Sequence, residues 1–178
     1  MEYQDLVDSI RDNLAQYRYT ELCEAVSIGG VDGVVVATPR RMMVRYLCGV
    51  FVLPDSCGTA DQAKETFEVI RTGLTKRYAR PPYWKELGTY SVWMCGSRLY
   101  DDLKTRFAEF KDKTGLHMNV MLGSVFVERE KFRNSAASTW GLYYSCKHFG
   151  AISATVNEWC KRMRGEQDVE TDASQPRS

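Results

Sequence analysis

Two cysteines occur in the same local pattern at two places in the chain, and each could act as a nucleophile. At both places an apolar run typical of a β-strand ends in Cys-Gly-hydroxyl, and a helical pattern follows. The two triplets are Cys57-Gly58-Thr59, within DSCGTADQ, and Cys95-Gly96-Ser97, within WMCGSRLY. A cysteine at a helix N-terminus has a lowered pKa, because the helix dipole and free N–H groups favour its thiolate. The pattern therefore allows a cysteine-dependent enzyme that uses Cys57 or Cys95.

The same two turns could instead bind a small anion without any catalysis. Free backbone N–H groups at a helix N-terminus are donors for phosphate or carboxylate oxygens. Ligands of open α/β sheets bind beyond the carboxyl ends of the strands, where both turns are expected to lie. The predicted ligand-binding residues are Cys57, Gly58, Thr59, Cys95, Gly96, Ser97 and Arg98.

Ordinary helix capping explains these residues without a ligand. Thr59 and Gln62 fit a capping box, in which each side chain satisfies a backbone N–H of the other residue. Ser97 is typical of an N-cap. A nucleophile also needs a base, and the two histidines are poorly placed for that role. His117 precedes a predicted strand, at the opposite sheet edge, and His148 falls on the last predicted helix.

The elements that must position these turns alternate between helical and strand patterns. Apolar periodicity predicts helices over 3–25, 59–79, 99–115 and 139–163, and strands over 34–37, 43–53, 89–95 and 118–127. This order, α-β-β-α-β-α-β-α, predicts a three-layer α/β domain with a mixed, mainly parallel four-stranded sheet. An α+β arrangement is the alternative.

Two segments are expected to lack regular structure. We interpret EREKFRNSAAS, after the last predicted strand, as a polar loop in which Glu128 and Glu130 are solvated. The stretch 165–178 has no apolar periodicity and is expected to be a disordered acidic tail. Residues 1–164 then form a single domain.

Composition excludes several classes of protein. Of the 178 residues, 44% are hydrophobic and 12% aromatic, which excludes a disordered chain. The N-terminus resembles neither a signal peptide nor a transit peptide, so we expect a cytoplasmic protein. The six cysteines include no CxxC pair and are expected to be reduced thiols, and no metal-binding or nucleotide-binding motif is present. We therefore expect no metal and no cofactor.

The charge distribution leaves two kinds of macromolecular partner open. Residues 25–164 carry 21 basic against 13 acidic side chains, and the segments 39–46 and 75–85 mix basic with aromatic residues. Such mixtures suit single-stranded nucleic acid. They equally suit a protein interface, because Trp, Tyr and Arg dominate interface hot spots. The predicted partner-binding residues are Arg80, Tyr83, Trp84 and Lys85, in the Pro-Pro loop.

The leading prediction is a small binding or regulatory module that is not an enzyme. It acts through protein partners or through a small anionic ligand at the carboxyl edge of the sheet. The alternatives are a cysteine-dependent enzyme and a nucleic-acid-binding protein that uses the basic central region.

Overall fold

The computed structural model describes residues 3–17, 22–38, 44–79, 86–106, 119–138 and 143–173. These residues form four helices and six strands. They are α1 (Gln4–Ala15), β1 (Leu22–Ile28), β2 (Val31–Ala37), β3 (Val44–Val52), α2 (Ala60–Tyr78), β4 (Glu86–Cys95), α3 (Ser97–Thr105), β5 (Asn119–Glu128), β6 (Asn134–Ser138) and α4 (Tyr143–Ala173). No helix within these ranges is long and apolar enough to cross a membrane.

The six strands form one mixed sheet in the order β1-β2-β3-β4-β5-β6. The pairs β3–β4 and β4–β5 are parallel, and each is joined by a helix; the other three pairs are antiparallel. The predicted α/β class is therefore confirmed. The predicted four-stranded, mainly parallel sheet is wrong in detail, because a strand is added at each margin by an antiparallel hairpin.

The strands predicted from the sequence did not include the two edge strands, β1 and β6, and the reasons differ. A helix was expected over 3–25, but α1 ends at Ala15 and its buried residues are Leu6, Val7, Ile10 and Leu14. The strand β1 has apolar residues at every second position, except where Glu24 interrupts the alternation. The strand β6 lies in the expected polar loop; its small residues carry no apolar signal, and pairing with β5 defines it. Tertiary pairing thus overrides weak local preference.

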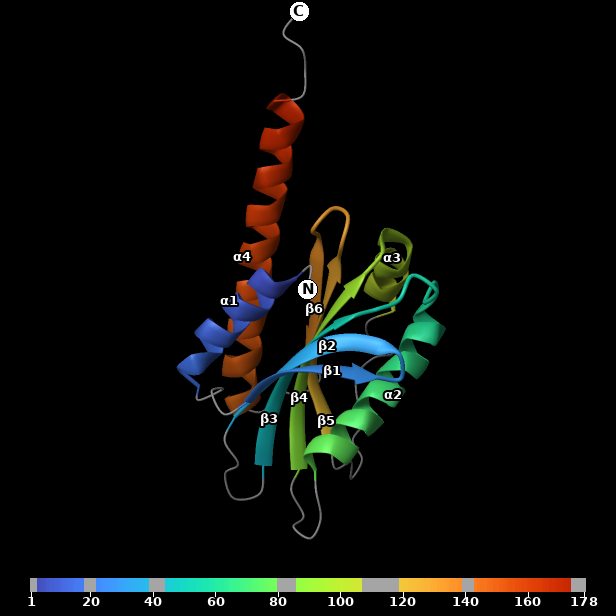
Figure 1. Ribbon diagram of the computed structural model, residues 1–178, viewed down its shortest axis with the longest axis vertical. Coiled ribbons are helices and arrows are strands. Elements are labelled where there is room, and N and C mark those ends of the chain that lie inside the picture. The colour runs from blue at the N-terminus through green and yellow to red at the C-terminus, as the bar shows by residue number, and fades with distance from the viewer. Residues whose placement is uncertain are drawn as a thin grey trace, which may run out of the picture.

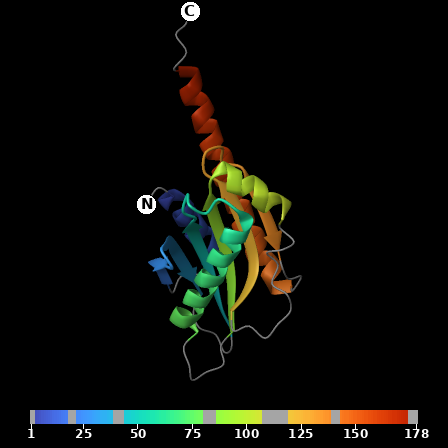
Figure 2. The same cartoon turned by 90° about the vertical axis from the view of Figure 1, so that its right-hand side faces the viewer.

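Helices cover both faces of the sheet, so the molecule has three layers (Figure 1 and Figure 2). The helices α1 and α4 lie on one face, where Leu6 and Ile10 pack with Val156 and Trp159 over the central strands. On the other face α2 and α3 cover a second core that includes Phe51, Trp93 and Phe126. The helix α4 continues to Ala173, past residue 165, where the acidic tail was expected to begin.

The helix α2 ties the central strands to the β1 edge. Its first turn is fixed by the predicted capping box, which the structure confirms for Thr59 and Gln62. Its buried face includes Ile70 and Leu74, each contributing about 1.5–3 kcal/mol by burial. Gly73 lets the helix approach β1 closely, since a Cβ atom there would lie 2.3 Å from Cγ2 of Ile28.

Candidate functional site

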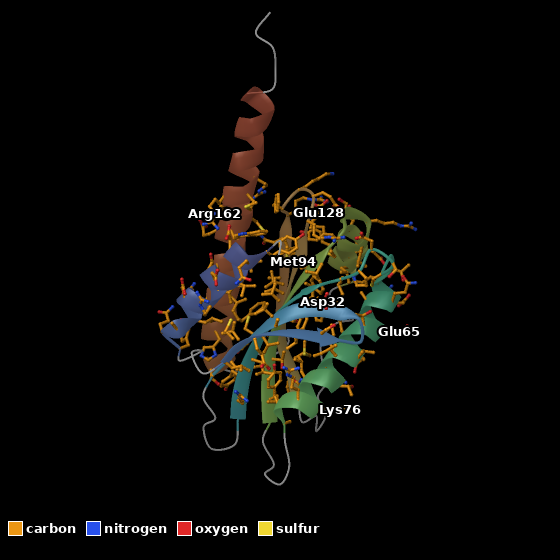
Figure 3. The ribbon with its side chains drawn as sticks, in the orientation of Figure 1. Asp32, Glu65, Lys76, Met94, Glu128 and Arg162 are labelled. Carbon is orange, nitrogen blue, oxygen red and sulfur yellow. The ribbon has the colours of Figure 1, made fainter. Side chains whose placement is uncertain are left out.

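The two Cys-Gly turns lie at the carboxyl edge of the central strands. Parallel pairing aligns Val52 at the end of β3 with Met94 near the end of β4. Cys95 in turn pairs with Glu128, the last residue of β5. Figure 3 shows Glu128 at this edge, beside α3. The structure therefore brings together the ends of three strands that are far apart in the sequence.

Neither cysteine at this edge has the chemistry of a nucleophile. Cys95 is fully buried, and burial raises the pKa of its thiol to about 12. Its Sγ donates a hydrogen bond of 3.4 Å to the carbonyl oxygen of Val127. Burial also raises the pKa of Cys57, against a smaller lowering by a hydrogen bond with Thr66. Both residues are therefore thiols at neutral pH, whereas nucleophilic attack requires a thiolate.

His148, the one histidine within the described residues, does not supply a base to these cysteines. His148 lies among aromatic rings on the α1 and α4 face of the sheet, with its centroid 4.8 Å from Tyr17 and 5.2 Å from Tyr46. Burial there lowers the pKa of its imidazole. His117 lies outside the described residues. The cysteine-dependent alternative therefore gains no support from the described part of the chain.

At the N-terminus of α2, the chain itself satisfies the backbone donors that an anion would use. The N–H groups of Gly58 and Thr59 donate to Oε1 of Gln62 over 2.9 and 3.2 Å. The N–H of Ala60 donates over 2.8 Å to Oδ2 of Asp102, from α3. A carboxylate of the protein thus already lies where a ligand anion was expected.

The N-terminus of α3 is filled in a similar way. Its N-cap is Gly96, not Ser97 as the sequence suggested, so the N-cap residue itself has no side chain with which to cap the helix. The N–H of Ser97 donates over 2.9 Å to Oε2 of Glu130, and Ser97 Oγ also contacts Oε1 of Glu128. Ser97 has two donors, its backbone N–H and its hydroxyl, and the hydroxyl carries only one hydrogen. The carboxylates of Glu128 and Glu130 therefore share these two donors. Arg98 is exposed beside them.

Glu128 is buried, which contradicts the expectation that it is solvated. Its side chain has no exposed surface, and its Oε2 accepts a hydrogen bond from Nε of Arg133. Burial raises the pKa of the Glu128 carboxyl, but hydrogen bonds from Arg133 and Ser97 outweigh it, and the net pKa lies below the usual range. Glu128 is therefore an ionised, structurally paired carboxylate.

The residues between β5 and β6, 129–133, close the carboxyl edge, and we call them the edge hairpin. The N–H of Arg129 donates over 2.9 Å to the carbonyl oxygen of Cys95, and its guanidinium pairs with Asp55. The guanidinium of Arg133 lies 5.1 Å from the ring centroid of Tyr100. Phe132 adopts a φ of 48°, uncommon for an aromatic residue, and packs 5.4 Å from Trp159.

A shallow pocket of about 450 Å³ opens beside this edge. Its lining residues are Gly29, Pro54, Ser56, Cys57, Gln62, Glu65, Thr66 and Val69. Glu65, on α2 (Figure 3), is its one charged lining residue. A pocket with a carboxylate and no cation is poorly suited to an anionic ligand.

A different candidate surface is the free edge of β1. This strand pairs with β2 over all seven of its residues, and no described segment pairs with its other edge. Its side chains Cys23, Ala25 and Ser27 are exposed, on the face that α1 and α4 cover farther into the sheet. Figure 2 shows β1 at the margin of the sheet. An unpaired strand edge presents backbone donors and acceptors to another chain.

The two basic segments meet in the structure, where Arg45 and Arg77 both contact Tyr78 or its neighbour Glu24. The guanidinium of Arg45, on β3, lies 5.7 Å from the ring centroid of Tyr78, and Arg45 is 6% exposed. Arg77 pairs with Glu24 over 3.0 Å. The predicted partner-binding residues Arg80, Tyr83, Trp84 and Lys85 lie outside the described residues. Nucleic-acid binding therefore remains an untested prediction.

The described residues contain no cluster of three or more His, Cys, Asp or Glu side chains that could hold a metal ion. Comparisons with protein-family models, with curated proteins and with solved structures find no match for this chain.

Proposed function

We propose that this protein is a non-catalytic binding module that recognises an extended segment of a protein partner by adding it as a strand to the free edge of β1. A cytoplasmic location, as expected from the sequence, is part of the proposal. In this mode of recognition, main-chain hydrogen bonds supply affinity, and alternate side chains supply specificity.

The observation that carries this proposal is that the described strand β1 lacks most of the devices that protect an edge strand; its one such device is Glu24, whose side chain points inward to Tyr78. Edge strands are usually protected by lysine, by proline, by a bulge or by shortness. The segment Leu22–Ile28 contains no lysine and no proline, and its register with β2 is unbroken over seven residues. The opposite edge strand, β6, is five residues long. The asymmetry favours β1 as the edge that meets a partner.

Glu24 is the one charged residue of β1, and its charge is already compensated. Oε1 of Glu24 accepts hydrogen bonds from Oη of Tyr78 over 2.5 Å and from Nε of Arg77 over 3.0 Å. The hydrogen bond from Tyr78, and then that from Arg77, hold the pKa of this carboxyl below its usual range. An added strand would therefore not meet an uncompensated buried charge.

The chemistry at the carboxyl edge favours binding over catalysis. The groups that resemble a reaction site are engaged in holding the edge hairpin and the two helix N-termini, as in the pairing of Ser97 with Glu128 and Glu130. A small anionic ligand at this edge is the second candidate. It would have to displace the protein's own carboxylates from Ala60 and Ser97.

Selection from a displayed library of random peptides tests the proposal. We expect selected peptides to bind the wild-type chain and to lose at least tenfold in affinity when alternate peptide nitrogens are methylated, because methylation removes main-chain donors. The variant Ala25→Lys should weaken binding, since lysine protects edge strands. Thr72→Lys, on the exposed surface of α2, is the matched control. Peptides that bind both variants and the wild type equally would contradict the proposal.

A further inference from the structure

We propose that the extended segment accepted by β1 is β1 of a second copy of this chain. The two strands pair antiparallel about a twofold axis that passes through Ala25, and they join two six-stranded sheets. This inference rests on the proposed function, because it uses the same free edge. Twofold homodimers are the commonest closed assemblies, and their interfaces use the same surface of both subunits.

The fold limits the registers that such a pair can adopt. Residues directly opposite each other in an antiparallel pair point to the same face of the sheet, and successive residues alternate between faces. The twofold axis runs perpendicular to the sheet, between the two strands. One residue must therefore lie directly opposite its own copy, and the axis passes midway between these two copies. The three central residues of β1, Glu24, Ala25 and Val26, are the candidates.

Charge and length select the register centred on Ala25. An axis through Glu24 places the two Glu24 carboxylates directly opposite each other, and like charges in that position are destabilising. An axis through Val26 leaves Leu22 and Cys23 beyond the end of the pair. With the axis at Ala25, which is the middle residue of Leu22–Ile28, all seven residues of each strand find an opposite residue.

Apolar side chains meet at both ends of the strand pair in this register. On the α2 side, Leu22 lies opposite Ile28 of the second copy; both residues are partly buried and pack against the core beneath α2. Cross-strand pairs of this kind are the unit of sheet stabilisation. Glu24 lies opposite Val26 of the second copy, and its charge remains compensated by Arg77 and Tyr78 of its own subunit.

The opposite face of the strand carries small side chains that permit close approach. Ala25 meets Ala25 of the second copy at the axis, and Cys23 lies opposite Ser27 of the second copy. All three residues are exposed in the single chain, so pairing requires no rearrangement of the core. The core under α1 and α4 includes residues of β2 to β5 but none of β1.

A disulfide cross-link tests the register directly. In an antiparallel pair, opposite Cβ atoms lie about 4.5–5.5 Å apart, close enough for a disulfide after a small adjustment. Ser27→Cys places a new thiol opposite the native Cys23 of the second copy. We expect mild oxidation with diamide to give a covalent dimer, in which mass spectrometry identifies a link between Cys23 of one copy and the introduced thiol at position 27 of the other. The double variant Cys23→Ser/Ser27→Cys should give no covalent dimer, because each introduced thiol then faces a serine.

Analytical ultracentrifugation supplies the second measurement. We expect the wild type and Thr72→Lys to dimerise reversibly, and Ala25→Lys to lose at least tenfold in dimer affinity because two ammonium groups meet at the axis. Urea unfolding checks that each variant is folded. A wild type that stays monomeric at the cross-linking concentration, or a dimer insensitive to Ala25→Lys, would overturn the inference. If a monomeric wild type still binds peptides at β1, the proposed function stands and only the dimer is refuted. If the wild type neither dimerises nor binds peptides, the dimer and the proposed function are both refuted.

Discussion

The carboxylate of Glu130 lies at the N-terminus of α3, where its Oε2 accepts a hydrogen bond of 2.9 Å from the backbone N–H of Ser97. A helix N-terminus attracts anions because its N–H groups are free and its dipole is positive. Here the anion belongs to the same chain, 33 residues away. At the carboxyl edge of the sheet, the edge hairpin therefore supplies the carboxylate that occupies the place of a ligand anion.

Removing this carboxylate should weaken the edge and expose an anion site. We expect Glu130→Ala to lower the free energy of unfolding by about 0.3–1 kcal/mol, the usual contribution of a charge at a helix terminus. Urea unfolding with and without sulfate measures the effect. Sulfate should stabilise Glu130→Ala more than an equally ionic solution of chloride does, while the wild type shows a smaller difference. Equal responses of the two proteins would contradict the role given to Glu130.

Cysteine reactivity should follow burial. At neutral pH we expect iodoacetamide to modify Cys23, which is exposed, well before Cys57 or Cys95, whose thiols have raised pKa values. Mass spectrometry of partly labelled, folded protein gives the order. A fast reaction at Cys57 or Cys95 would instead favour the alternative of a cysteine-dependent enzyme.

Glu128 should make stability depend on acid pH. Its folded pKa lies below the unfolded value of about 4.5, so its ionised form stabilises the fold above that pH. This contribution is lost as the pH falls from 4.5 through the folded pKa. We expect Glu128→Gln to cost about 1.5–3 kcal/mol at pH 7, the usual value for a charged hydrogen bond, and less at about pH 3. Urea unfolding at both pH values checks this.

The matched control for Glu128 is Glu65→Gln, because Glu65 is an exposed carboxylate on α2. Exposed substitutions usually change the free energy of unfolding by less than about 0.5 kcal/mol. A Glu128→Gln variant that matches this control at neutral pH would show that the buried pair with Arg133 is not stabilising.

The contact between Gly73 and Ile28 should fix β1 against α2. Alanine normally favours a helix over glycine by about 1 kcal/mol. At position 73, however, the added Cβ would lie 2.3 Å from Cγ2 of Ile28. We therefore expect Gly73→Ala to destabilise the protein by about 1–3 kcal/mol, as overpacking does.

A double-mutant cycle measures this contact. Gly73→Ala/Ile28→Ala should be more stable than the sum of the two single variants predicts, because the second change removes the clash. Thr72→Ala, an exposed change on the same helix, should not couple to Ile28→Ala. Additive effects of Gly73→Ala and Ile28→Ala would show that α2 and β1 do not press against each other here.

The sequence predicted the parts of the fold that local patterns encode. Thr59 and Gln62 specify the start of α2 by a capping box, and the apolar runs ending at Val52 and Cys95 mark two central strands. Pairing those strands in parallel then brings both Cys-Gly turns to one edge. These features depend on residues close together in the chain, so a single sequence suffices to find them.

The rest depends on contacts between distant residues. Nothing local distinguishes a solvated Glu128 from one buried beneath Arg133 and Ser97, and the polarity of the segment favoured the wrong choice. Phe132 is the one signal that was available, because a lone aromatic residue in a polar stretch suggests a buried anchor. The strand β1 was hidden because Leu22 and Val26 also continue a helical spacing, and pairing with β2 decides between the two.

Residue-resolved amide hydrogen exchange of β1 tests the central claim most directly. Amides of an edge strand alternate between those that face the neighbouring strand and those that face outward. In the monomer we predict protection of the β1 amides that face β2 and fast exchange of the others. Addition of a selected peptide or of a second copy should then protect the fast amides. If every β1 amide is already protected in the monomer, or if binding leaves the fast ones unchanged, β1 is not the edge that receives a partner.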